Sequence, residues 1–106
     1  MNYPIILIPS MKPEGMAIFP FILIKDKYRI NDPVLIRHET IHLRQQLEML
    51  VFPFYVIYLI NYLFNLLKYK NTRLAYRNII FEREAYQHDR EPDYLTRRKF
   101  WAWIKK

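Results

Sequence analysis

The amino-acid sequence predicts an α+β protein that is mainly α-helical, with short N-terminal strands followed by about four helices. Two observations support this class. Runs of β-branched and aromatic residues lie before residue 25, whereas each later apolar segment has helical length and starts at a capping residue or a proline. The chain has 106 residues, the length of one domain, so we expect a single domain over residues 1–106.

The N-terminal region, residues 1–31, is predicted to supply the strands. Residues 5–8 read Ile-Ile-Leu-Ile and fit a short strand. Residues 16–24 are also β-prone, but Pro20 has no N–H to donate to a neighbouring strand. We therefore expect residues 16–24 to form an edge strand, after a loop.

Four helices are predicted in the remainder of the chain. Asp32 suits the N-cap position and Pro33 the first helical residue, and Pro53 begins a second helix. Asn71 or Thr72 caps a third helix, and Asp93 caps a fourth. The predicted helices cover residues 33–50, 53–70, 72–89 and 93–104.

Composition and charge narrow the chemistry. The chain has no cysteine, which excludes a disulfide scaffold, a thiolate metal site and a cysteine nucleophile. Its net charge of +7 favours anionic partners such as nucleic acid or an anionic membrane surface. The first residues lack the features of a signal peptide, so we expect the cytoplasm or the cytoplasmic face of a membrane.

The segment His38-Glu39-Thr40-Ile41-His42 carries the strongest chemical signal. On a helix, His38 and His42 lie on one face, about 40° apart, where two imidazoles can hold one zinc ion. Glu39 lies about 100° from His38, where it can reach a water on that metal. This is the H-E-x-x-H arrangement of two zinc ligands and a general base, so zinc is the expected cofactor.

The alternative is a surface helix with two titrating histidines. The helical wheel opposes it, because the charged residues Arg37, Arg44 and Glu48 form one narrow stripe. The histidines point nearly the opposite way. They share their side with four apolar residues: Val34, Leu35, Ile41 and Met49. Buried imidazoles need partners, and a metal supplies one for each.

Catalytic zinc usually takes a third protein ligand, and Glu82 is the candidate. It lies at the centre of the apolar face of the predicted third helix, where an unpaired carboxylate is costly. Glu84 lies some 200° away and is expected to be a solvated charge. The alternative for Glu82 is a buried salt bridge, for example to an arginine of the first helix.

These segments resemble the gluzincin metallopeptidases. One gluzincin branch opens its third-ligand motif E-x-x-A-D with the ligand; Glu82 and Ala85 match this motif, and Tyr86 replaces the Asp. The size is similar to that of the minigluzincins. A similar pattern also occurs in short uncharacterised bacterial proteins. The resemblance implies a zincin-like domain that binds zinc through His38, His42 and Glu82.

The expected activity is hydrolysis of a peptide bond in a peptide or protein substrate. Glu39 takes a proton from the zinc-bound water and passes it to the leaving nitrogen. An edge strand holds the substrate in extended form. Tyr86 and His88 are the candidates for stabilising the oxyanion. The alternative function is a non-catalytic, metal-stabilised module that binds a membrane or nucleic acid.

The uncharged residues 50–67 predict membrane association. As a helix they span about 27 Å, close to the hydrocarbon thickness of a bilayer. A complete span would place His42 and Glu82 on opposite sides of the membrane. The segment must therefore pack as a middle helix or dip into one leaflet. The basic and aromatic residues 97–106 suit an anionic membrane or nucleic acid, and they equally suit a solvated face with both tryptophans in the core. Nucleic acid is the less favoured partner.

Overall fold

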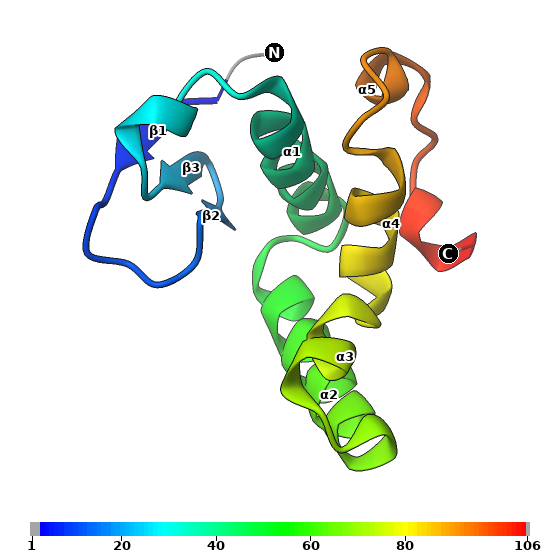
Figure 1. Ribbon diagram of the computed structural model, residues 1–106. Helices are drawn as coiled ribbons and strands as arrows, with labels where there is room; N and C mark the ends of the chain where they lie inside the picture. The colour runs from blue at the N-terminus through cyan, green and yellow to red at the C-terminus, as the bar shows by residue number, and fades with distance from the viewer. Residues whose placement is uncertain (1–2, 106) are drawn as a thin grey trace.

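The computed structural model describes residues 3–105 and has a small sheet beside an array of helices (Figure 1). The predicted α+β, mainly α class is confirmed. The strands are β1 (Ile5–Leu7), β2 (Gly15–Ile18) and β3 (Phe21–Ile24). The α-helices are α1 (Pro33–Glu48), α2 (Phe52–Tyr69), α3 (Thr72–Arg77), α4 (Ile80–His88) and α5 (Tyr94–Arg97). Two 3-10 turns, η1 (Lys27–Arg29) and η2 (Ala102–Lys105), complete the described chain.

The sheet has the order β1-β3-β2, with β1 parallel and β2 antiparallel to β3. The single strand expected over residues 16–24 is wrong. This segment is a hairpin, because Phe19 and Pro20 form the two-residue turn between β2 and β3. Proline without an N–H is tolerated in the turn and not within a paired strand. Within this segment β2 is nevertheless an edge strand of the sheet, as β1 is on the other side.

Helix α1 lies between the sheet and α4. The Asp32 carboxylate accepts hydrogen bonds from the backbone N–H groups of Val34 and Leu35, as the sequence predicted. One side of α1 packs Leu35 and Leu43 against the sheet. The other side packs Ile41 against Ala85 of α4 and Tyr94. Burial of each such aliphatic side chain contributes about 1.5–3 kcal/mol, so the two contacts hold α1 firmly.

Helix α2 turns sharply away from α1. The connecting residues Leu50 and Val51 have φ angles of 58° and 67°, which redirect the chain before α2 begins at Phe52, with Pro53 in its first turn. Within the described residues, no one helix has both the length and the apolar composition of a membrane span. Taken together, α1 and α2 meet those two criteria, but their axes differ by 113°.

The third helix, expected over residues 72–89, is in fact two helices. The chain breaks at Asn78 and Ile79, where the Asn78 side chain donates to the Leu74 carbonyl at 2.8 Å and Ile79 is extended. The amide oxygen of Asn61 on α2 then accepts from the Ile80 N–H at 2.8 Å and caps α4. A side chain from another helix therefore compensates for the lost intrahelical bonds.

The prediction of a single fourth helix over residues 93–104 is also wrong. Helix α5 ends at Arg97, and Arg98 has an extended backbone that sends its guanidinium inward. Arg98 pairs with Glu48 and Glu84, and the Trp101 N–H donates to Glu48 at 2.7 Å. These ionic contacts replace helical hydrogen bonds and tie the C-terminal segment to α1 and α4.

Candidate metal centre

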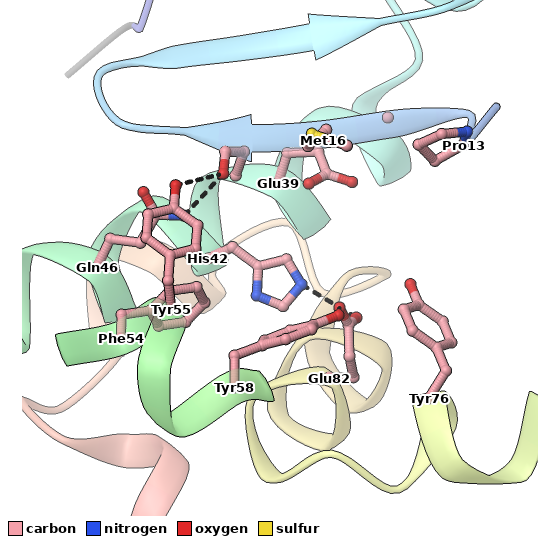
Figure 2. A pocket seen from close by; sticks show the side chains of 12 residues that line it. Pro13, Met16, Glu39, His42, Gln46, Phe54, Tyr55, Tyr58, Tyr76 and Glu82 are labelled. Atoms are coloured by element: carbon pink, nitrogen blue, oxygen red, sulfur yellow. Dashed lines mark hydrogen bonds and ion pairs between the residues drawn. The ribbon is translucent and has the colours of Figure 1, made fainter. Parts of the chain in front are cut away.

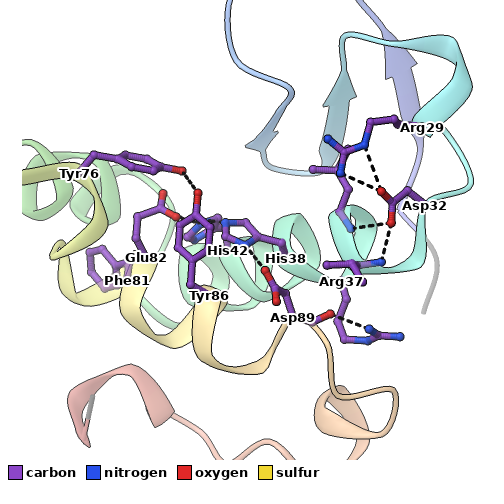
Figure 3. Close-up of polar contacts among 12 residues, drawn as sticks. Arg29, Asp32, Arg37, His38, His42, Tyr76, Phe81, Glu82, Tyr86 and Asp89 are labelled. Atoms are coloured by element: carbon purple, nitrogen blue, oxygen red, sulfur yellow. Dashed lines mark hydrogen bonds and ion pairs between the residues drawn. The ribbon is translucent and has the colours of Figure 1, made fainter. Parts of the chain in front are cut away.

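Three side chains from two helices meet between α1 and α4 (Figure 3). His38 Nε2 lies 3.1 Å and His42 Nε2 lies 3.0 Å from the same oxygen, Glu82 Oε1. The three residues are 6%, 5% and 4% exposed, so water does not solvate them freely. Within residues 3–105, this is the one group of three or more His, Cys, Asp or Glu side chains placed to hold a metal.

Local structure explains this meeting. His38 and His42 are one turn apart on α1, so their rings project side by side, with centroids 5.0 Å apart. Glu82 lies in the first turn of α4, whose start is fixed by Asn61. The contact of Ile41 with Ala85 holds the two helices together one turn from the cluster.

A second layer of side chains orients the first. His38 Nδ1–H donates to Asp89 Oδ2 at 3.0 Å, and His42 Nδ1–H donates to the Gln45 amide oxygen at 2.8 Å. Both bonds place a proton on Nδ1, so each Nε2 faces Glu82 and, in the neutral ring, presents its lone pair to a metal ion. Tyr58 donates to the other carboxylate oxygen, Glu82 Oε2, at 2.7 Å. Metal-binding histidines and carboxylates commonly have such supporting partners.

Charge within the cluster is strongly coupled. Burial lowers the pKa of His42, but the neighbouring Glu82 carboxylate outweighs burial and raises it to about 9. Burial raises the pKa of Glu82, but attraction to His42 and hydrogen bonds with both rings hold it well below its ordinary value. Without a cation, a protonated His42 therefore balances the Glu82 carboxylate, and a metal ion supplies the same positive charge.

Glu39 lies beside this cluster, and it faces β2. It is 6% exposed, and a Cβ added at Gly15 would lie 3.0 Å from Glu39 Oε2. The absence of a side chain at Gly15 therefore leaves room for the carboxylate. Burial raises the pKa of Glu39, although the charges of His42 and His38 oppose the rise. Such a shift brings a carboxylate closer to the range of a general base at neutral pH.

Two pockets open on either side of Glu39 and share Gly15 and Tyr76 in their walls. The first, of about 320 Å³, is mainly apolar and reaches His42 and Glu82 (Figure 2). Its apolar and aromatic walls come from Met16, Ala17, Phe54, Tyr55 and Tyr58. The second, of about 600 Å³, reaches His38 and is polar. Three arginines line it: Arg29, Arg77 and Arg90.

The sequence interpretation placed Glu84 wrongly. It was expected in solvent, but its exposure is 0%. It accepts from Gln45 at 2.9 Å, from Tyr94 at 2.6 Å and from Arg98 at 3.0 Å. Arg98 arrives from the C-terminal segment and neutralises the carboxylate, which a wheel of one helix does not reveal.

The two oxyanion candidates have different positions. The Tyr86 ring lies 4.5 Å from the His38 ring, and Tyr86 lines the polar pocket. His88 stacks on Tyr94 at 3.9 Å, pairs with Glu91, and lines neither of the two pockets. His88 therefore has a packing role, whereas Tyr86 borders the site.

Sequence reasoning missed the supporting residues Asp89, Gln45 and Tyr58. Asp89 follows Glu82 by two helical turns, and this spacing would have indicated a carboxylate on the same face. Gln45 likewise lies three residues after His42 on α1. Tyr58 belongs to another helix, and nothing local in the sequence marks it.

The donor set fits a metal ion with an open position. Two imidazole nitrogens and one carboxylate oxygen are buried and held in orientation. The proton on His42 balances the negative charge of Glu82, and a metal cation can replace that proton. The structure thus supports a possible metal site and an H-E-x-x-H arrangement. No family model matches the chain, and neither curated proteins nor solved structures give a significant match.

Proposed function

We propose that this protein is a small zinc-dependent, gluzincin-like metallopeptidase that hydrolyses a peptide bond in an extended polypeptide. The observation that carries the proposal is the position of Glu39, whose buried carboxylate lies beside the group of His38, His42 and Glu82. A structural zinc site needs no such acid and usually fills all four ligand positions with protein. Here three donors and an adjacent acid leave one position for water.

His38, His42 and Glu82 would hold the zinc ion. A zinc ion held there would polarise the substrate carbonyl and lower the pKa of its bound water. Glu39 accepts the proton of the attacking water and delivers it to the leaving nitrogen, so its raised pKa suits both steps. Asp89 and Gln45 keep the two imidazoles in the tautomer that presents Nε2.

The edge strand β2 supports an extended substrate. The Lys25 N–H donates to the Glu14 carbonyl, which sets the register of hydrogen bonds between β2 and β3. In this register the backbone N–H and C=O groups of Gly15 and Ala17 point away from β3. Gly15 and Ala17 line the apolar pocket beside Glu39. A substrate added along this edge would hydrogen-bond to the backbone at Gly15, because the Ala17 carbonyl already accepts from the Gln46 amide at 2.8 Å and from the Tyr55 hydroxyl at 3.3 Å.

Replacement of Glu39 by glutamine tests the proposal. Glutamine is nearly isosteric but accepts no proton, so Glu39→Gln should retain zinc and lose cleavage of a mixed peptide library by about a hundredfold or more. Asp93→Asn, whose side chain is 71% exposed just before α5 and lines neither pocket, is the matched control and should cleave normally. Undiminished cleavage by Glu39→Gln would remove Glu39 from this role. Zinc binding without any cleavage by the parent protein would instead favour the non-catalytic module.

A further inference from the structure

Helix α2 has an apolar face that no other part of the described chain covers. Its members recur at helical spacing along the whole helix and are between 41% and 78% exposed. They are Phe52, Val56, Leu59, Ile60, Leu63, Phe64 and Leu67. These seven residues form the α2 apolar face. Figure 1 shows α2 at the far end of the molecule from the sheet, with α3 beside it.

The orientation of this face is fixed by the opposite side of α2. There, Phe54 is buried against Met49, Ile79 and Phe81. Asn65 donates to the Ala75 carbonyl at 3.1 Å, and Asn61 caps α4. Rotation of α2 would break these contacts, so the helix cannot turn its apolar face inward. Continuous apolar surfaces of this kind mark a binding surface for protein or lipid.

The charge around α2 indicates which partner it meets. Between Glu48 and Glu82 the sequence contains no acidic residue. Four basic residues lie in that interval, at or after the end of α2: Lys68, Lys70, Arg73 and Arg77. All four are exposed. A second copy would bring the same positive charge to the interface, whereas an anionic lipid surface attracts it.

We propose that α2 lies in the plane of an anionic lipid bilayer, with its apolar face among the upper acyl chains and its basic end among the headgroups. The packed side of α2 carries Asn61 and Asn65, which remain bonded to protein, so the helix has one face for lipid and one for its own core. This arrangement keeps α1 and α4 on one side of the membrane. The cytoplasmic leaflet, which is rich in anionic lipid, is the matching surface.

Vesicle flotation tests the proposal. The purified protein should float with vesicles of equal parts phosphatidylcholine and phosphatidylglycerol, and less with phosphatidylcholine alone or at high salt. A double variant, Phe64→Ser with Leu67→Ser, should bind the anionic vesicles at least about tenfold more weakly. Tyr28→Ser is the control, because Tyr28 is 83% exposed on η1, away from α2. Glu39→Gln should bind like the parent, which separates this proposal from the peptidase.

A label placed in the apolar face gives a second readout. The chain has no cysteine, so Leu63→Cys carries a single environment-sensitive fluorophore. Its emission should shift to the blue with anionic vesicles and be quenched by shallow nitroxide lipids, whereas a label at Tyr28→Cys should not change. Equal vesicle binding by the double variant, or a concentration-dependent dimer without vesicle binding, would overturn the proposal.

Discussion

The Gln45 side-chain amide donates a hydrogen bond to Glu84 at 2.9 Å, while its oxygen accepts from His42 at 2.8 Å. One amide therefore connects the candidate metal centre to the buried ion cluster of Glu84, Glu48 and Arg98. The C-terminal segment thus supports the centre although it contributes no ligand.

Removal of the Arg98 guanidinium should destabilise the protein strongly. Arg98→Met leaves two buried carboxylates, Glu84 and Glu48, without their cation, and loss of such a partner costs about 3–5 kcal/mol. Urea unfolding followed by circular dichroism measures the change in the free energy of unfolding. Arg97→Met is the matched control, because the Arg97 side chain is 51% exposed, and its loss should cost less than about 1 kcal/mol. Equal effects of the two variants would contradict a buried ion cluster.

Metal content should distinguish Glu82 from Glu84. The purified protein should hold about one zinc ion per chain, and His38→Ala or Glu82→Gln should lower that content strongly. Glu84→Gln should retain zinc, because its oxygens face Gln45, Tyr94 and Arg98. Elemental analysis after dialysis gives the stoichiometry. Full zinc retention by His38→Ala would place the metal elsewhere.

Loss of the Tyr58 hydroxyl should weaken the metal without removing a ligand. Tyr58→Phe deletes the 2.7 Å hydrogen bond to Glu82 Oε2 and should reduce zinc affinity by about tenfold. Competition with a chromophoric chelator measures the affinity. Tyr62→Phe, on the same helix, provides the comparison and should bind zinc like the parent.

Zinc affinity should rise with pH. Zinc requires neutral His42, whose pKa is raised to about 9 in the metal-free protein, so binding must release its proton. Affinity should increase between about pH 6.5 and 9 and level off above that range. Because the folded pKa exceeds the ordinary value of 6.5, the stabilising pair of protonated His42 and Glu82 is complete below that pH. The free energy of unfolding of the metal-free protein should therefore fall as the pH rises through about 9.

Replacement of Gly15 by a larger residue should displace Glu39 but leave metal binding largely intact. The new Cβ would lie 3.0 Å from both Glu39 Oε2 and Leu35 Cδ1, so Gly15→Val must displace the carboxylate. Peptide cleavage should fall by about tenfold or more, while zinc content stays near that of the parent. Loss of zinc together with activity would show that the strand, and not the carboxylate, was disturbed.

Much of the site could be predicted from spacing alone. His38 and His42 share a helical face, and Glu82 interrupts an apolar face, so local periodicity was enough to select all three. The same reasoning failed for Glu84, because its partner Arg98 lies 14 residues later in a segment whose path depends on tertiary contacts. Asn61 is a visible polar residue in an otherwise apolar stretch, but its capping of α4 depends on how the helices cross.

The expected helix lengths failed for a related reason. Intrinsic propensity favours continuation from Thr72 to Asp89 and from Asp93 to Ile104. Contacts between distant residues end these helices earlier, namely the Asn61 cap on α4 and the inward turn of Arg98. The hairpin of β2 and β3 is different, because a local residue, Pro20, marks its turn in the sequence. Pro20 was interpreted as part of an edge strand and not as a turn residue.

Placement of the ligands on α1 and α4 makes a bound ion a cross-link. The loop that it closes contains all of α2 and α3, and loop-closure entropy makes such a link more effective for a long loop than for a short one. In the described chain none of the three donors lies on α2 or α3. The arm formed by these helices therefore supplies no ligand, but it supports Glu82 through the Tyr58 hydrogen bond and through the Asn61 cap of α4. Ion retention and the position of this arm are therefore coupled within one short chain.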